Sequence, residues 1–438
     1  MFRRLIITIL SVVAVSLFSA SAQSAYDRMR DSILSSRKFI PLETSRDSAD
    51  RQRTDSIALV IERFYADQFH HFQDPEAPYF MFVSRDSKLS MGIGGAVRMR
   101  GYYEWGGVIP ASAFIPYLIP MTPDPAQMRK FDTTPAGTCL FFKVIGQNKT
   151  LGNYMLYIET NFSGYESRDL KLKKAYAVIN DFTIGYANST FSDPSALPPV
   201  IDAHGAANKI TPTSVLVRWM PRVKKHWVFA VSAETPSTQV DADGTNTKTV
   251  TNSMPDFAAF AQYEWGPTSH IRLSGIVRRL AYRNLIEERN HARAGWGVQL
   301  SGTGHPADPL TLYGSLCYGH GYAGLGSELM MGNYDLVADP ARPGYLYAPA
   351  SYGWCLGVQY NIRPNLFVSA ALSQNRYLPA CSVASDEFKY GMSGDVNIFW
   401  YLTPRIQAAA EFNIGNRCNF SGHTRYARRV GLMCQFSF

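Results

Sequence analysis

The stretch LSMGIGGAVRMRGYYEW, residues 89–105, alternates between two kinds of side chain along its whole length. Most odd positions are apolar, among them Val97 and Met99, whereas the even positions are small or polar, among them Arg98 and Arg100. A period of two predicts a β-strand with one apolar and one polar face. The stretch is also longer than a typical strand of a soluble protein.

The same alternation recurs to the end of the chain and predicts an even number of strands. We expect sixteen, at approximately 88–105, 138–147, 151–162, 170–179, 182–188, 213–220, 226–234, 256–265, 270–281, 292–302, 310–320, 351–361, 365–375, 388–401, 405–415 and 425–438.

The connections between these strands alternate in length. Every second one is short and rich in turn residues, as at Asn148-Lys149, Asn180-Asp181 and Thr403-Pro404. Most of the others are long: 106–137, 189–212, 235–255, 321–350 and 376–387. Short turns at one rim and long loops at the other are the layout of an outer-membrane barrel. The sequence therefore predicts an all-β fold, a transmembrane antiparallel β-barrel of about sixteen strands over residues 87–438.

The two faces of the predicted strands indicate where lipid and water lie. In the last strand, Val430 and Leu432 share the apolar face, while Arg429 and Gln435 share the polar one. A polar inner face suits a water-filled lumen, and closure leaves no unpaired edge in lipid. Aromatic residues near strand ends predict a membrane-interface girdle, although core packing is the alternative: Trp105, Trp219, Trp265, Trp400, Tyr360 and Tyr401.

The N-terminal residues predict export. Arg3 and Arg4 precede an apolar run, and Ala20-Ser21-Ala22 fits a cleavage site, so we interpret residues 1–22 as a signal peptide. An uncleaved anchor is the alternative. Residues 23–86 would form a periplasmic segment with a short amphipathic helix near 56–72, and no later run is apolar over the ~18 residues that a transmembrane helix needs.

Enzyme and cofactor motifs are missing from the sequence. The six cysteines form no CxxC pair, there is no GxSxG, HExxH or P-loop, and the histidines do not fall at metal-ligand spacing. A hydrolase using His320 on the barrel wall is a weak alternative. We therefore expect no enzymatic activity and no cofactor. We also expect no nucleic-acid partner, because the net charge of +8 is modest.

The parity of the strands assigns more cations than acids to the inner face. The predicted pore-lining cations are Arg98, Arg100, Lys143, Lys171, Lys173, Arg218, Arg272, Arg278, Arg293, Arg405 and Arg429. The acids on the same faces are Glu104, Glu159, Asp395 and Glu411. A column of cations raises the local concentration of anions, unless loop acids neutralise it.

Residues 189–212 are a candidate constriction loop that folds into the barrel. Phe191, Asp193 and Asp202 would belong to it, with the two aspartates facing the arginines across the pore. The alternative is an ordinary surface loop.

The chain resembles the DcaP-like family of trimeric outer-membrane porins. The resemblance rests on the segment 56–72, the opening strand around 91–102, the run 184–194 (IGYANSTFSDP) and the terminal Phe438. It implies a sixteen-stranded barrel, a homotrimer, periplasmic N-terminal helices and uptake of small anions such as dicarboxylates. The N-terminal helix is shorter here than a full coiled coil.

The predicted function is therefore that of a porin in the outer membrane of a Gram-negative bacterium, passing small and preferentially anionic solutes. Outer-membrane lipid and lipopolysaccharide are the expected surroundings. A general or carbohydrate-type porin without strong charge selectivity is one alternative, for which inner-facing Tyr102, Tyr157 and Tyr313 would be suited. A structural or adhesin barrel filled by its loops is another.

Overall fold

A computed structural model of the chain describes residues 80–83, 89–148, 150, 152–162, 170–205, 207–224, 226–265, 269–326 and 328–438. The predicted signal peptide and the predicted helix at 56–72 lie outside these residues. Within the described ranges, no helix is both long enough and apolar enough to span a membrane.

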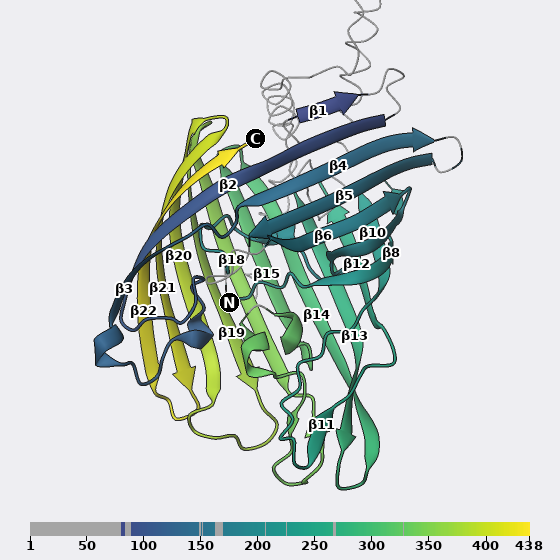
Figure 1. Ribbon diagram of the computed structural model, residues 1–438, viewed down its shortest axis with the longest axis vertical. Helices are drawn as coiled ribbons and strands as arrows, with labels where there is room; N and C mark the ends of the chain where they lie inside the picture. Colours follow the sequence, from purple (N-terminus) through teal and green to yellow (C-terminus); the bar gives the residue numbers. More distant parts are fainter. Residues whose placement is uncertain are drawn as a thin grey trace, which may run out of the picture.

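The chain forms a closed antiparallel β-barrel of sixteen strands, which confirms the predicted fold class (Figure 1). The barrel strands are β2 (Leu89–Trp105), β4 (Cys139–Asn148), β5 (Gly152–Phe162), β6 (Leu170–Ile179), β7 (Phe182–Asn188), β8 (Thr213–Trp219), β10 (Trp227–Glu234), β12 (Asp256–Glu264), β13 (His270–Asn284), β14 (Arg289–Ala307), β15 (Leu310–His320), β18 (Ala350–Arg363), β19 (Leu366–Leu378), β20 (Phe388–Thr403), β21 (Ile406–Asn419) and β22 (Thr424–Ser437).

The first and last barrel strands close the sheet. Along β2, Ala96 pairs with Cys139 of β4 on one side and with Ser437 of β22 on the other. Two backbone hydrogen bonds join Gly95 and Phe438, with N···O distances of 2.8 and 2.9 Å. Closure satisfies backbone groups that an open edge would leave unpaired in lipid.

Two further strands extend the pairing of β2, which is longer than its neighbour β4. β3 (Arg129–Thr134) continues the ladder beyond β4 by pairing with Arg100–Trp105. β1 (Phe80–Val83) pairs with Ser90–Ile93, although it falls in the segment predicted to precede the barrel. Both elements were missed by the sequence analysis, and both occupy edges of β2 that would otherwise lack hydrogen-bond partners.

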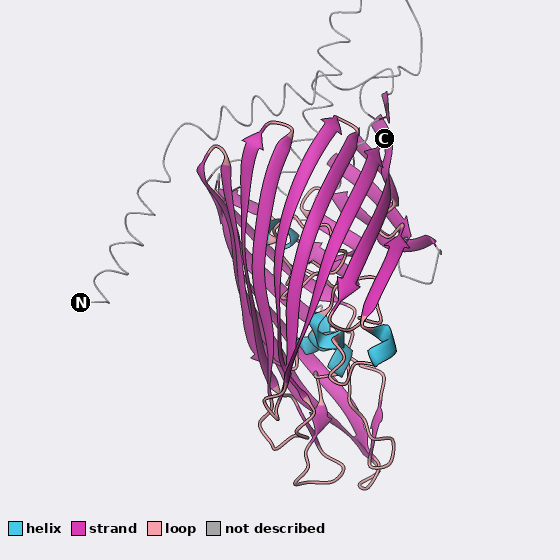
Figure 2. Cartoon of the chain, turned by 90° about the vertical axis from the view of Figure 1, so that its left-hand side faces the viewer, coloured by secondary structure: helices cyan, strands magenta, loops and turns pink. Residues whose placement is uncertain are grey.

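The remaining elements are short and belong to turns and loops. The strands are β9 (Arg222–Lys224), β11 (Thr247–Thr249), β16 (Val337–Ala338) and β17 (Leu346–Tyr347). The 3₁₀ helices, drawn in cyan in Figure 2, are η1 (Pro116–Leu118), η2 (Pro125–Gln127), η3 (Pro194–Ala196), η4 (Ala323–Leu325) and η5 (Leu329–Gly332). The C-terminus lies at the rim of the short turns, opposite the end where β11 marks the long loops (Figure 1).

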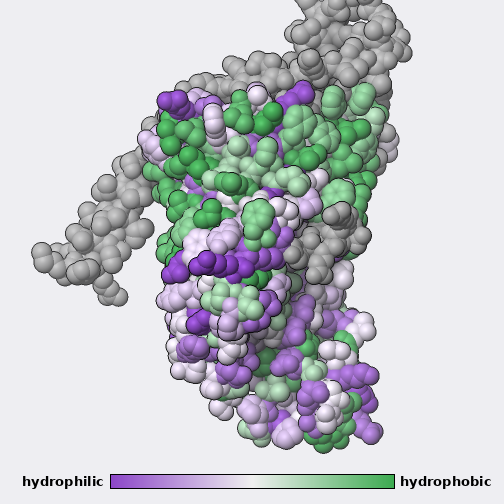
Figure 3. Space-filling view, turned by 60° about the vertical axis from the view of Figure 1, so that its left-hand side comes forward, coloured by the Kyte–Doolittle hydropathy of each residue, from purple (hydrophilic) through white to green (hydrophobic). Residues whose placement is uncertain are grey.

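The outer wall is apolar and the inner wall polar. Leu432, Val277 and Leu356 are 63, 61 and 60 % exposed on the outside, whereas Arg429 and Gln435 on the opposite face of β22 are buried. Figure 3 shows the apolar side chains gathered in a broad zone above a more hydrophilic part of the surface. Trp219, Tyr360, Trp400 and Tyr401 are exposed on this wall and do not pack in a core.

Candidate functional site: the channel interior

The loop 189–212 leaves β7 and turns into the barrel. Phe191 is fully buried and its ring meets that of Tyr322 edge-on, with centroids 6.3 Å apart. Its carbonyl oxygen accepts a hydrogen bond from Ser274 Oγ of β13 at 2.8 Å. The start of the loop is therefore fixed against the inner wall and does not extend from the rim.

Asp193 is the main polar anchor of the loop. Its carboxylate lies 2.9 Å from His270 Nε2 and 3.4 Å from Arg272 Nη1, and it accepts a hydrogen bond from Ser301 Oγ at 2.6 Å. Burial opposes ionisation, but Arg272 and then His270 outweigh it and hold the pKa of Asp193 well below its usual range. Asp193 is thus a buried anion held by Arg272 and His270 of the wall.

The middle of the loop follows the inner wall across several strands. Thr303 Oγ1 of β14 donates to the carbonyl of Ser195 at 2.7 Å, and Ser369 Oγ of β19 donates to that of Pro199 at 2.6 Å. Further along, the Ala207 amide donates to Ser373 Oγ at 2.8 Å. Backbone groups of the loop are therefore paired with inward-facing hydroxyls, as buried polar groups require.

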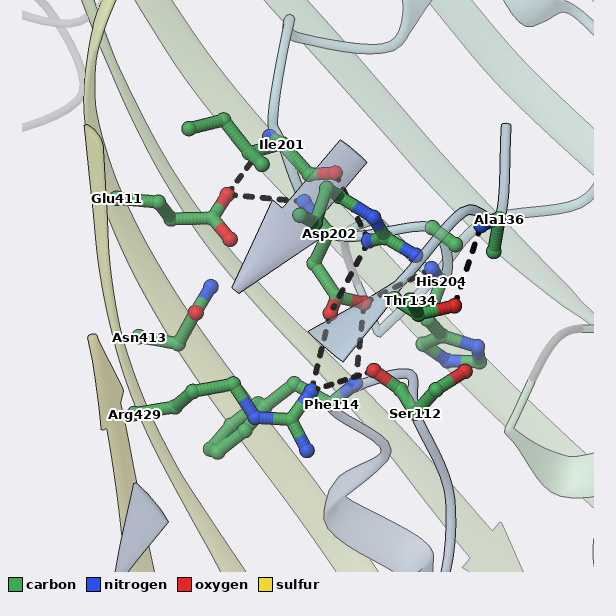
Figure 4. Close-up of polar contacts among 12 residues, drawn as sticks. Ser112, Phe114, Thr134, Ala136, Ile201, Asp202, His204, Glu411, Asn413 and Arg429 are labelled. Atoms are coloured by element: carbon green, nitrogen blue, oxygen red, sulfur yellow. Dashed lines mark hydrogen bonds and ion pairs between the residues drawn. The ribbon is translucent and has the colours of Figure 1, made fainter. Parts of the chain in front are cut away.

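The tip of the loop is held by a network around Asp202 (Figure 4). Asp202 Oδ2 lies 3.3 Å from Arg429 Nη1 and 3.9 Å from Arg100 Nη1, and Oδ1 accepts from the Phe114 amide at 3.0 Å. Glu411 of β21 accepts hydrogen bonds from the amides of Ile201 and Asp202 at 2.8 and 3.2 Å. The tip thereby reaches the wall formed by β21, β22 and β2.

Arg429 also binds a second loop. Its guanidinium pairs with Glu104, and the distance from Nε to Oε2 is 2.8 Å. Its Nη1 donates a hydrogen bond to the Ser112 carbonyl at 2.8 Å. The guanidinium carbon lies 4.1 Å from the centre of the Tyr102 ring, at a cation–π distance. One arginine therefore connects the loops 106–128 and 189–212.

Most of the predicted pore-lining cations face inward but are covered. Arg100, Lys143, Arg218, Arg272, Arg278 and Arg429 are each at most 5 % exposed. Arg278 pairs with Asp256 and Asp335, both at 3.0 Å, and Arg218 donates to the Asn188 carbonyl at 3.3 Å. Asp193 and Asp202 also contact wall arginines directly, whereas the sequence analysis predicted that they face the arginines across the pore.

The other predicted cations are more accessible or lie at the rims. Lys171 is exposed, and Lys173 pairs with Glu159 at 2.6 Å while its side chain remains 46 % exposed. Arg98 is half-buried and donates from Nε to Gln435 at 2.7 Å. Arg293 donates to the Leu346 carbonyl at 3.0 Å in the long-loop half. Arg405 lies in the short turn before β21, where the sequence predicted the strand to start.

A β-bulge adds one cation that the sequence analysis missed. The register of β5 and β6 shifts between Glu159 and Thr160, so Lys174 faces inward, 3.8 Å from Glu159. An extra residue in one strand reverses the parity beyond it, and a bulge leaves little trace in an alternating pattern.

The loop tip supplies two further groups that parity could not identify, because they lie on no strand. Burial, and then Lys209, lower the pKa of His204 to about 4, against the raising effect of Asp202. Burial, and then the like charge of Lys173, lower the pKa of Lys209. Lys209 Nζ donates a hydrogen bond to the Ala203 carbonyl at 3.2 Å. The repulsion between Lys209 and Lys173 brings a cation of the loop and a cation of the wall into electrostatic interaction.

The mouth of the barrel is narrowed by the loops 106–128 and 321–349. Leu336 and Leu346 pack on Leu280 and Tyr282 of β13. Glu328 is fully buried, its Oε2 3.3 Å from Asn375 Nδ2 of β19, and burial raises its pKa to about 8. The mouth loops therefore share a packed interface with the wall.

His320 lies at the end of β15 and contacts the rings of Trp296 and Tyr318, with Nδ1 3.3 Å from the Ala348 carbonyl. Among the described residues, no serine hydroxyl forms a hydrogen bond with this ring. Within the described ranges, His, Cys, Asp and Glu side chains form no group of three able to hold a metal ion.

Comparisons with known proteins place the fold. No protein-family model and no curated protein matches the chain in sequence. The outer membrane channel DcaP of Acinetobacter baumannii is similar in structure, with a TM-score of 0.68 and 20 % identity over 82 % of this chain and 99 % of that one.

Two porin-like structures are more distant. An anion-selective porin from Comamonas acidovorans has a TM-score of 0.52 and 9 % identity, covering 80 % of this chain and 100 % of that one. The outer-membrane expressed OmpT of Vibrio cholerae has a TM-score of 0.51 and 7 % identity, covering 81 % of this chain and 100 % of that one. The chain thus has the barrel fold of the DcaP outer-membrane channel, as its sequence resemblance to the DcaP-like porins indicates.

Proposed function

We propose that the chain is a porin of the bacterial outer membrane that passes small solutes by diffusion and favours anions. The observation that supports diffusion is the closed barrel with an apolar outside, a polar inside and a loop folded against its inner wall. Dicarboxylates are the solute class that the resemblance to DcaP-like porins implies. The N-terminal segment 23–86 would lie in the periplasm.

The proposed anion preference rests on which charges solute can reach. The acids Glu104, Asp395 and Glu411 are at most 4 % exposed. By contrast, Lys171 and Lys173 are exposed, and Lys173 lies near Lys209 of the loop tip. Around Glu159, Lys173 and Lys174 leave a local excess of one positive charge, from two cations and one anion. Accessible cations in a narrow channel attract anions.

Reversal potentials across planar bilayers in a salt gradient test this proposal. Wild type should favour chloride over potassium, and removing one lysine charge by Lys173→Gln or Lys209→Gln should lower the permeability ratio about fivefold, for a loss of ~1 kcal/mol. Lys248→Gln, in β11 at the far tip of the loops, is the matched control and should leave the ratio unchanged. A cation-selective wild type would reject the anion preference.

A general porin with weak charge selectivity is the second candidate. It is favoured by the pairing of Arg100, Arg278 and Arg429 with buried acids, which cancels much of the predicted cation column. A reversal potential near zero, together with equal permeation of neutral and charged solutes into liposomes, would support this candidate over the first.

We also propose a homotrimer, as the resemblance implies. β7 and β8 contain seven residues each, fewer than the about 9–11 that a lipid-facing strand needs. A neighbouring copy over this low part of the wall would shield it from lipid. Cross-linking in membranes and conductance steps in groups of three are the expected results, and single steps only would contradict the trimer.

A further inference from the structure

A groove lies at the long-loop rim, beside Arg376 at the end of β19. Its volume is about 410 Å³, and it is lined by residues 376–379 at the end of β19, residues 381–383 of the following loop and Phe420 of the next loop. Its lining includes no residue of the loop 189–212, and two of its aromatic residues, Tyr377 and Phe420, pack in a cluster with Tyr334 and Phe388.

A row of aromatic side chains and one cation borders this groove. The strand register pairs Tyr318 with Tyr352, Tyr352 with Arg376, and Arg376 with Tyr390 across four adjacent strands. Their positions share the parity of the exposed residues Leu316, Leu356 and Leu372, so the row belongs to the outer face. Tyrosine at this level is typical of a membrane–water interface.

The rows next to it, toward the short turns, are mostly apolar, with Gln374 beside Trp354 as a polar member. The same register places Leu316 beside Trp354, and Leu356 beside Leu372, with Val358 and Val396 further down the wall. Leu356 and Val396 are 60 and 58 % exposed. Arg376 therefore marks the level at which hydrocarbon gives way to polar head groups.

Arg376 has no carboxylate partner among the described residues. The contact that it makes is with the Tyr390 ring, whose centre lies 5.8 Å from the guanidinium carbon. A second cation adjoins the groove, because the register shift between Phe388 and Tyr390 displaces Lys389, whose Nζ lies 5.8 Å from the centre of the Phe420 ring. Two cations thus flank an aromatic-lined groove.

We propose that this groove binds the phosphorylated head group of an acylated glycolipid in the outer leaflet. Arg376 would bind a phosphate with its planar fork, and Lys389 would add a second positive charge. The sugar would occupy the groove against the Phe420 ring, and the acyl chains would lie along Leu356 and Leu372. The inference rests on the outer-membrane location in the proposed function, but not on ion selectivity.

The groove favours a glycolipid over other anionic amphiphiles. A volume of about 410 Å³ exceeds what a single phosphate occupies, so a bulkier head group is needed to fill it. Aromatic faces accommodate the C–H side of a sugar ring, whereas the ammonium of a zwitterionic phospholipid would be repelled by Lys389. Charge and shape together therefore select a phosphorylated saccharide.

Native mass spectrometry of the detergent-purified full chain tests the site. The probe is a bisphosphorylated, acylated diglucosamine, titrated in parallel with its dephosphorylated form and with phosphatidylglycerol. Wild type should bind the phosphorylated probe about tenfold more tightly than either comparison lipid, and Arg376→Gln should weaken it about tenfold, as expected for one charge-assisted contact. Arg289→Gln is the control, because Arg289 is an exposed arginine at the start of β14, away from the groove lining.

Three results would overturn the site: unchanged binding in Arg376→Gln, equal binding of the dephosphorylated probe, or equal binding of phosphatidylglycerol. Heat-modifiable mobility on gels reports whether each variant folds, and Arg376→Lys, which keeps the charge, should retain binding within about threefold. Conductance separates the two proposals, since Arg376→Gln should conduct like wild type. Glycolipid binding by a chain that never conducts would reject the porin function and leave the site intact.

Discussion

Asp193→Asn is the sharpest test of how the loop 189–212 is held inside the barrel. The substitution keeps the shape of the side chain and an acceptor for Ser301, but it removes the charge that faces His270 and Arg272. Loss of one partner from a buried ion pair costs roughly 3–5 kcal/mol. We expect the lower value, because Arg272 keeps its bonds to Gln262 and to the Ser192 carbonyl.

A loss of about 3 kcal/mol raises the open population of the loop root roughly a hundredfold. Hydrogen exchange of the Ala196 and Leu197 amides, which bond to the carbonyls of Asp193 and Pro194, should accelerate by this factor. Single-channel current noise should increase in parallel. Asp124→Asn, a substitution at an exposed local cap in another loop, should change neither reading. Exchange within about threefold of wild type would refute the anchoring role of Asp193.

Three other perturbations address the mouth, the loop tip and the lipid face. Burial raises the pKa of Glu328 to about 8, so the packing around it contributes its full stability below the ordinary pKa of 4.5 and weakens as the pH rises through 8. Glu328→Gln should abolish this alkaline loss of stability in thermal unfolding scans, and a variant with the same pH profile as wild type would contradict the role of Glu328. Burial, and then Lys209, lower the pKa of His204 to about 4, so the seated loop tip is fully stable above the ordinary value of 6.5 and weakens down to 4. His204→Gln should therefore remove an acid-induced rise in current noise, and noise that persists would exclude His204 as its source. Leu432→Arg places a charge on the lipid face and should destabilise the barrel in vesicles by roughly 2–4 kcal/mol by denaturant titration, whereas Leu432→Met should leave it within about 0.5 kcal/mol.

The strands of the barrel were predictable because each has a face in lipid and a face in water. In β22 the alternation of Val430 and Leu432 with Arg429 and Gly431 leaves one register possible, since a shift by one residue would expose the arginine to lipid. Loop lengths then assigned the two rims. All sixteen strands have counterparts in the prediction, with differences mainly at the ends, as for β14, which extends to Arg289–Ala307.

The interior of the channel was harder to predict because its contacts join residues far apart in sequence. Parity assigned Arg429 to the inner face, but it carries no information on its pairing with Glu104 and Asp202. The sequence leaves two alternatives for the course of the loop 189–212, because its backbone hydrogen bonds to Ser369 and Glu411 cannot be seen in a local pattern. Lys209 was missed for the same reason.

The seating of the loop tip has a consequence for the order of assembly. Asp202 is 227 residues from Arg429, and Ile201 is 210 residues from Glu411, so the tip binds strands that emerge last from the ribosome. Contacts of such long sequence separation form only after the intervening chain is ordered. A chain that lacks β22 would lack Arg429, the cation that lies 3.3 Å from Asp202, so the complete network at the tip marks a barrel whose final strand is in place.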